Sequence, residues 1–262
     1  MKKPLILFSL AITIFSSQLL FAQTAEERGL EIAKKQVVRD QGWIDLQADL
    51  EMILFNRHGE QSNRSNSIKT MEVKDDGDKS LIVFHTPKDL KGTAMLTYSH
   101  AVVPDEQWLY LPALKRTKRI SSSNKSGPFL GSEFAYEDLS SFEIEKFSYK
   151  YIKEESIKGR PCYVVEYTPL YSNSGYTRQL AWVDKELYHP LRIDFYDRKN
   201  EILKTLTFDG YKKYLDKIWR PTTMDVVNHQ TGKRTLLTWN NIRLNTGLKD
   251  SEFSTAKLKT AR

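Results

Sequence analysis

The sequence predicts a mainly β protein with one long N-terminal helix, and two patterns carry this prediction. From Ile44 onward apolar and polar residues alternate with a period of two, which is typical of strands with one face toward solvent. Across residues 24–40 the apolar residues recur at helical spacing instead. Parallel βαβ units are excluded because the chain offers no further helices as crossovers. We therefore expect a strongly curved antiparallel sheet, wrapped around the helix as its apolar partner.

Residues 1–22 have the layout of a signal peptide. Two lysines precede an apolar run over residues 5–15, and the segment ends on the small residue Ala22. The run is shorter than the about 20 residues that cross a bilayer core, so a cleaved leader is favoured over an uncleaved anchor. We expect cleavage after Ala22 and a periplasmic protein. Gln23 stands where a lipoprotein would carry its acylated cysteine, so no lipid modification is expected.

Residues 23–262 are expected to form a single domain. They contain 38 basic and 33 acidic residues, a net charge of +5, which is mildly basic and not typical of a nucleic-acid-binding protein. Cys162 is the only cysteine, so no intramolecular disulfide is possible. The stability of this domain must come from its core.

The elements follow from local patterns. Thr24 and Glu27 form a capping-box sequence, which predicts a helix from Ala25 to Asp40. A long alternating strand follows over residues 44–54. Further strand-like runs cover residues 68–73, 81–85, 94–99, 108–111, 147–152, 162–167, 180–183, 191–196, 202–208, 223–227 and 235–239. Short turn sequences separate neighbouring runs and predict a meander, whereas the Ser- and Gly-rich segment of residues 121–141 is expected to be an irregular excursion between two halves of the sheet.

Motifs for metal or cofactor chemistry are not visible in the sequence. The five histidines are scattered, so we expect no metal site and no cofactor. Three aspartates at positions 75, 76 and 78 are interpreted as a hairpin turn, because a calcium loop would need a longer ligand series. Glu143 and Glu145 could form a glycosidase pair, but only the abundance of carboxylates in the sequence supports this interpretation. No nucleophile or phosphate-binding motif is present, which disfavours an enzyme.

The densest group of positive charges is Lys115-Arg116-Thr117-Lys118-Arg119, which follows an apolar run and precedes a serine-rich stretch. Arg116, Lys118 and Arg119 are its candidate docking residues, here called the basic cluster. It is either a solvated turn or a docking site for an acidic membrane surface or an acidic partner. We expect it at the rim of a cavity, in transient contact with a membrane surface. Nucleic acid is not an expected partner.

Four segments then carry a resemblance to a known family. They are Phe84-His85-Thr86-Pro87, Lys91-Gly92-Thr93, Trp108-Leu109-Tyr110-Leu111-Pro112-Ala113-Leu114-Lys115-Arg116 and Gly131-Ser132-Glu133-Phe134-Ala135-Tyr136-Glu137-Asp138-Leu139. With the strand pattern, they resemble the LolA-like outer-membrane lipoprotein-sorting proteins, in the longer branch whose genes often neighbour RND-type exporters. The resemblance implies a half-open β-barrel with short helical lid elements and an apolar cavity for acyl chains. It also implies, as partners, lipid or lipoprotein acyl chains and an RND-type inner-membrane exporter.

The function expected from these inferences is a periplasmic carrier or chaperone that binds a lipid, acyl chains or another hydrophobe. Aromatic and aliphatic residues of the predicted strands are the candidates for the cavity lining. They are Trp108, Tyr110, Leu180, Trp182, Leu191, Ile193 and Phe195. Two alternatives stay open at this point: a lipid-sensing regulatory protein of the same fold, and a periplasmic hydrolase.

Overall fold

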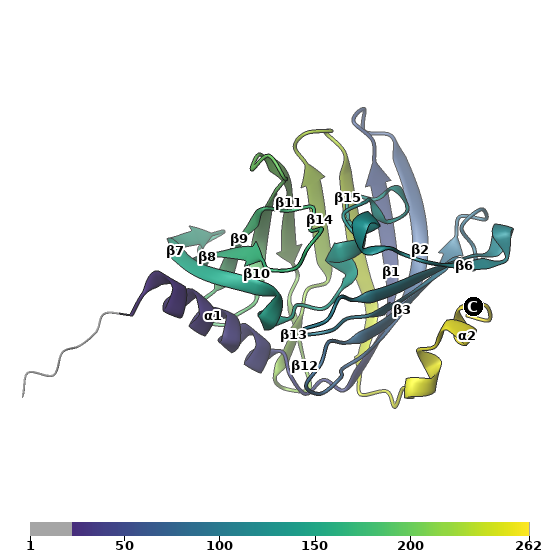
Figure 1. Ribbon diagram of the computed structural model, residues 1–262, viewed down its shortest axis with the longest axis horizontal. Coiled ribbons are helices and arrows are strands. Elements are labelled where there is room, and N and C mark those ends of the chain that lie inside the picture. The colour runs from purple at the N-terminus through teal and green to yellow at the C-terminus, as the bar shows by residue number, and fades with distance from the viewer. Residues whose placement is uncertain (1–22, 262) are drawn as a thin grey trace, which may run out of the picture.

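A 13-stranded antiparallel sheet dominates the computed structural model, which describes residues 23–261 (Figure 1). The order in the sheet is β6-β5-β4-β3-β2-β1-β15-β14-β11-β10-β9-β8-β7. Its strands are β1 (Asp45–Phe55), β2 (Gln61–Met71), β3 (Lys79–Thr86), β4 (Ala94–Tyr98), β5 (Glu106–Leu111), β6 (Arg116–Arg119), β7 (Phe147–Ile157), β8 (Arg160–Pro169), β9 (Arg178–Asp184), β10 (Pro190–Tyr196), β11 (Ile202–Asp209), β14 (Thr223–Asn228) and β15 (Arg234–Leu244). A separate hairpin pairs β12 (Lys212–Tyr214) with β13 (Ile218–Arg220).

The sheet curves without closing, so it forms the half-open barrel that the resemblance implies (Figure 1). Its two halves are meanders, and they meet where the first strand, β1, pairs with the last, β15. The open edges, β6 and β7, come from the middle of the chain. Residues 120–146, here called the strap, join these edges through the 3-10 helices η2 (Ser122–Asn124), η3 (Phe129–Gly131), η4 (Tyr136–Leu139) and η5 (Ile144–Lys146).

The N-terminal helix α1 (Ala25–Arg39) begins as the sequence predicts. The Thr24 hydroxyl accepts from the Glu27 amide at 3.1 Å, and the Glu27 carboxylate accepts from the Thr24 amide at 2.9 Å. The helix lies beside β7 (Figure 1). A Cβ at Gly29 would come within 2.8 Å of the Lys150 amide nitrogen, so only glycine permits this close approach.

The main core fills the concave face of the sheet. Apolar residues of β1, β3, β11, β14 and β15 pack there with Phe129 and Phe134 of the strap, both almost fully buried. A second core lies between α1 and the strands β7 to β9. The outer face of β3 to β5 is covered by the C-terminal segment with α2 (Thr255–Leu258), whose Leu258 and neighbouring Phe253 are buried.

The predicted elements agree well with the structure from residue 23 onward, with one large gap. The predicted helix and first strand correspond to α1 and β1, and residues 121–141 are irregular as expected. The first half of β2, Gln61 to Asn66, was not predicted because it is polar throughout and has no alternation. The hairpin of β12 and β13 was also not predicted. The predicted signal peptide and its cleavage after Ala22 lie outside the described residues.

Candidate functional site: a cavity on the concave face

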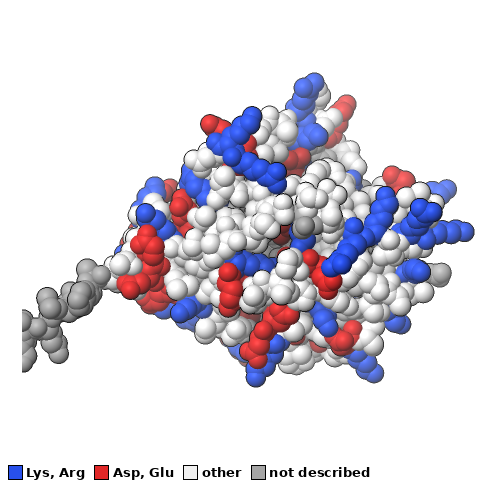
Figure 2. Space-filling view, in the orientation of Figure 1, with Lys and Arg blue, Asp and Glu red and all other residues white. Residues whose placement is uncertain are grey.

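A cavity of about 1830 Å³ lies between the concave face of the sheet, the C-terminal end of α1 and the strap. Its floor is built of apolar side chains from β1, β10, β11, β14 and β15, which alternate with outward-facing residues along each strand. They include Leu46, Ile193, Phe195, Leu206, Met224 and Trp239. In Figure 2, residues other than Lys, Arg, Asp and Glu form a broad area above the centre of the view, with charged side chains below it. The cavity is large and apolar enough to shield a hydrophobic ligand from water.

The strap closes part of the cavity and is tied to both halves of the sheet. On β5, the Gln107 side chain donates to the Tyr136 carbonyl at 2.8 Å. On β11, the Lys204 ammonium donates to Asp138 at 2.5 Å and to the Glu133 carbonyl at 2.9 Å. Lys204 and Asp138 are almost completely buried, at 4% and 8% side-chain exposure, so this ion pair is shielded from water. The strap is therefore held by a buried polar link.

Two of the seven predicted lining residues, Ile193 and Phe195, line this cavity. Both belong to β10, where alternation from Ile193 to Phe195 keeps the two side chains on the concave face. Phe195 packs against Tyr176 with the ring centroids 4.8 Å apart. Their role in binding a ligand stays a prediction.

Trp108 and Tyr110 do not line the cavity, which corrects the prediction for β5. They pack on the outer face against the C-terminal segment, while Leu109 between them points into the main core. The Trp108 ring also meets that of Tyr98 edge to face at 5.2 Å. Both faces of this strand are apolar, so the sequence pattern could not indicate which one faces the cavity.

Leu180, Trp182 and Leu191 also lie on the outer face, around the buried Cys162. The Arg192 guanidinium lies 4.5 Å from the centre of the Trp182 ring on this side. For Leu191 the reason is a register irregularity between Pro190 and Arg192 in the pairing of β10 with β9. Such a bulge changes the face on which the preceding residues lie, so the alternation from Leu191 to Ile193 is broken.

The basic cluster forms the short edge strand β6. Arg116, Lys118 and Arg119 are exposed, and Arg119 also lines the cavity, so one end of the cluster lies at the rim. Arg119 pairs with Glu106 at 2.5 Å. Figure 2 shows Lys and Arg side chains gathered at the side of the molecule where Figure 1 places β6. Charged residues on an exposed edge strand also hinder pairing with strands of other molecules. The sequence alone did not reveal that the basic cluster lies on such an edge.

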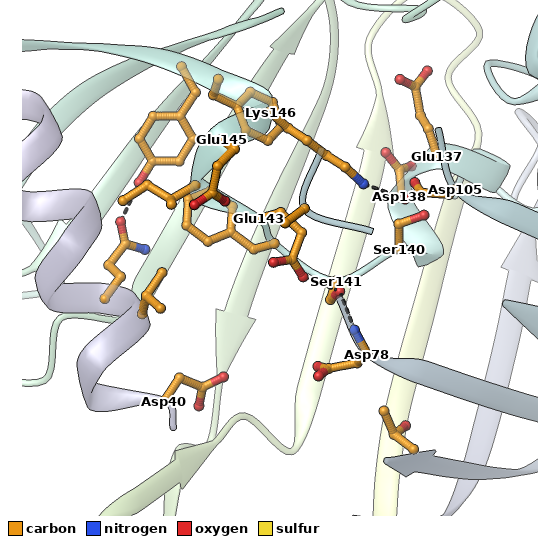
Figure 3. A pocket seen from close by; sticks show the side chains of 18 of the residues that line it. Asp40, Asp78, Asp105, Glu137, Asp138, Ser140, Ser141, Glu143, Glu145 and Lys146 are labelled. Atoms are coloured by element: carbon orange, nitrogen blue, oxygen red, sulfur yellow. Dashed lines mark hydrogen bonds and ion pairs between the residues drawn. The ribbon is translucent and has the colours of Figure 1, made fainter. Parts of the chain in front are cut away.

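An acidic wall faces the cavity from the β2–β3 loop and the strap (Figure 3). Its residues are Glu72, Asp75, Asp76 and Asp78 of the loop and Glu137, Asp138, Glu143 and Glu145 of the strap. The Asp78 amide donates to the Ser141 hydroxyl at 3.1 Å, and that hydroxyl donates to Glu143 at 2.5 Å. Burial raises the pKa of Asp78 to about 7, and the negative charges of Glu143, Glu72 and Asp40 contribute to the rise. Burial also raises the pKa of Glu143. The sequence pattern places Asp78 in a hairpin turn and offers Glu143 only as a partner of Glu145, and no motif indicates that Asp78 and Glu143 face the same cavity.

Within residues 23–261 no group of three or more His, Cys, Asp and Glu side chains has the arrangement of a metal site. None of the helices in that same range is both long and apolar enough to span a bilayer.

An open, curved sheet with a strap over an apolar cavity is a LolA-like fold. The structure of a LolA superfamily protein from Nitrosomonas europaea has this fold, with a TM-score of 0.70 and 19% identity over 90% of this chain and 99% of that chain. A putative outer membrane lipoprotein-sorting protein domain from Vibrio parahaemolyticus is 55% identical, covering 89% of this chain and 99% of that one, with a TM-score of 0.88.

A more specific assignment follows from two further matches. A DUF1329 family protein from Desulfovibrio piger is 32% identical over 90% of this chain and 99% of that chain, with a TM-score of 0.85. A family model described as an uncharacterized protein matches residues 76–260. A comparison with curated proteins finds no match. The chain belongs to the DUF1329 family and has a LolA-like fold.

Proposed function

We propose that this protein is a periplasmic carrier that binds a lipid, acyl chains or another hydrophobe in its cavity and exchanges it with an envelope membrane protein. The observation that carries the proposal is the cavity of about 1830 Å³ with its floor of aliphatic and aromatic side chains. Each methylene buried there contributes roughly 0.8 kcal/mol, so an acyl chain of ordinary length gains enough to stay bound in transit. Release follows when a membrane partner offers a better site.

The cellular setting is part of the same proposal. The leader pattern of residues 1–22 supports export, and the Vibrio parahaemolyticus relative is described as an outer membrane lipoprotein-sorting protein domain. An RND-type inner-membrane exporter is the partner that the sequence resemblance suggests. The cavity supports a carrier more than a hydrolase, because its apolar floor provides binding surface without requiring a reaction.

Ile193 and Leu180 offer a matched test of the cavity. Both are half-buried, but Ile193 lines the cavity and Leu180 lies on the outer face. We expect Ile193→Lys to weaken binding of the neutral fluorescent hydrophobe N-phenylnaphthylamine by about ten-fold or more, because it places a charge in an apolar site. Leu180→Lys should leave binding within about two-fold of the unmodified protein, since its ammonium reaches solvent outside the cavity.

The measurement is a fluorescence titration, with circular dichroism spectra showing that both variants are folded. Equal losses in the two variants, or binding no tighter than to an unrelated β protein, would contradict a ligand site on the concave face.

The basic cluster is proposed to dock the carrier on an anionic surface. Replacing Arg116, Lys118 and Arg119 by glutamate should slow transfer of the bound hydrophobe to anionic vesicles by about ten-fold, because each basic residue near such a surface is worth about 1 kcal/mol. Added salt should slow transfer by the unmodified protein in the same way, since exposed charges are screened over about 8 Å at physiological ionic strength. Affinity for the hydrophobe should not change.

The control replaces Lys199, Lys212 and Lys213, which are exposed elsewhere on the molecule, by glutamate. This variant has the same net charge as the triple change in β6. If both variants transfer equally well, β6 is a protected strand edge and has no docking role.

A further inference from the structure

Charged side chains are unevenly distributed around the cavity. Among residues 23–261, ten carboxylates line it, against five lysine and arginine side chains. The chain as a whole shows the opposite balance, with 40 basic and 33 acidic residues. The cavity is therefore an acidic region within a basic protein.

The five basic side chains do not neutralise the acidic wall. Lys146 and Lys125 both approach Asp105, and Arg220 pairs with Asp40. Arg119 is engaged by Glu106, and Lys74 is exposed. Over residues 23–261 no basic side chain forms an ion pair with Asp78 or Glu143. Asp78 and Glu143 are thus two of the lining carboxyls without a basic partner, and they belong to residues that a hydrogen-bond chain through Ser141 brings together.

The Ser141 hydroxyl links the two residues, because it accepts from the Asp78 backbone amide and donates to the Glu143 carboxylate. Asp78 also accepts from the Val73 amide at 3.3 Å. Figure 3 shows Asp78 and Asp40 turned toward each other across the space below Glu143, with Lys146 directed away toward Asp105. The influence of Glu143 and Asp40 on the pKa of Asp78 agrees with this proximity. The arrangement concentrates negative charge at one place in the cavity.

A second observation points to a ligand in the same cavity. His189 lines it, is only 8% exposed, and has a buried Nε2 atom without a hydrogen-bond partner. Burial lowers the pKa of this imidazole, so the ring is neutral at physiological pH. A neutral imidazole offers a ligand a hydrogen bond without adding positive charge, which suits a ligand that is itself cationic.

We propose that the ligand is a hydrophobe bearing a protonated amine, with its ammonium group at Asp78 and Glu143 and its apolar part on the floor formed by Ile193, Phe195 and Met224. This inference rests on the proposed carrier function and narrows its ligand class. An ammonium group has three donors and no acceptor, so it satisfies several carboxylate oxygens at once. A metal ion is the weaker candidate, because the described residues form no metal-site cluster and the floor is apolar.

The test compares three twelve-carbon ligands that differ only in their head group. Dodecylamine, dodecanol and dodecanoate are titrated, below their micelle concentrations, against the protein loaded with N-phenylnaphthylamine. We expect dodecylamine to displace the probe at about ten-fold lower concentration than dodecanol, and dodecanoate to be the weakest, because charge interactions are strong in a partly desolvated site.

Neutral variants of the wall identify the residues responsible. Asp78→Asn with Glu143→Gln should abolish the preference for dodecylamine and leave dodecanol unchanged. Glu154→Gln, which changes an exposed carboxylate of β7 outside the cavity, is the control and should keep the preference.

The preference should also increase from about pH 6 to about pH 8 in the unmodified protein, because Asp78 loses its proton in that range. The groups that face it are Val73, Ser141, Glu143, Glu72 and Asp40.

The outcomes separate the two proposals. If the three ligands displace the probe equally, or dodecanoate is preferred, the inference about the amine is wrong and the carrier function stands. If none of them displaces the probe, both proposals fail. A preference for dodecylamine that survives in the double variant also overturns the assignment to Asp78 and Glu143. If calcium ions alone abolish the preference at equal ionic strength, the site is a metal site.

Discussion

Replacing Asp78 by asparagine should raise the free energy of unfolding at pH 8 by about 2 to 4 kcal/mol. Burial and neighbouring carboxylates raise the pKa of Asp78 from 3.8 to about 7, so its ionised form is disfavoured in the folded protein. A shift of this size corresponds to about 4 kcal/mol. Asparagine keeps an oxygen for the Val73 amide and has no charge to bury.

The sign follows from proton binding. Between about pH 4 and pH 7 the folded protein holds a proton on Asp78 that the unfolded chain has lost, so stability falls as pH rises through this range. Below about pH 4 both states are protonated and the cost disappears. The gain from asparagine should therefore be absent at about pH 4, grow up to about pH 7 and stay constant above it.

Urea unfolding at several pH values measures this effect. Asp75→Asn, in the same turn but exposed, is the matched control and should change stability by less than about 0.5 kcal/mol. A gain in the free energy of unfolding for Asp78→Asn that does not depend on pH would contradict the prediction. So would a loss at pH 8, because either result means that folding does not disfavour the ionised carboxylate. A positive result would mean that the protein gives up stability to keep this carboxylate in its cavity.

Asp138→Asn should lower the free energy of unfolding by about 3 to 5 kcal/mol, because it leaves the Lys204 ammonium buried without a negative partner. Lys204 is 3% exposed, and its ammonium also lies about 5 Å from the rings of Tyr176 and Phe195. Asp138 additionally accepts from the Tyr176 hydroxyl at 2.7 Å and from the Ala135 amide at 2.6 Å. The strap should exchange its amide hydrogens faster in this variant.

Adding Lys204→Met to Asp138→Asn should recover most of the loss, because the second change removes the unpaired charge. A double-mutant cycle measured by urea unfolding gives the coupling between the two side chains. Strictly additive effects would mean that they do not form a buried pair. Lys158→Met with Asp209→Asn, an exposed pair at 2.6 Å, is the control and should show coupling below about 1 kcal/mol.

How much of the structure could be predicted depended on how local its determinants are. The capping box of Thr24 and Glu27 and the alternation over residues 44–54 predicted α1 and β1, since both signals are contained in a few residues. The pairing of β1 with β15 has no local signal. The first half of β2 was missed because it is polar on both faces. Even on the concave face, opposite Met52 and Leu50 of β1, it carries Arg64 and Asn66.

The site was predictable only in part for a related reason. Alternation correctly placed Ile193 and Phe195 together, but a single bulge put Leu191 on the other face. Where both faces of a strand are apolar, as around Trp108, the pattern does not distinguish cavity from outer surface. The acidic wall brings together the β2–β3 loop and the strap, which are separate in the sequence, and only the tertiary structure makes them neighbours.

The pairing of β1 with β15 also sets the order in which the molecule is completed. The two strands are joined along nearly their whole length, although about 190 residues separate Leu50 from its partner Trp239. Until the last strand arrives, one long edge of β1 has no neighbour and presents unpaired amide and carbonyl groups to other chains. Contacts between residues so distant in the chain form slowly. A chain emerging from its N-terminus is therefore most prone to aggregation just before its end appears, and a chaperone that covers β1 during this interval would raise the yield of folded protein.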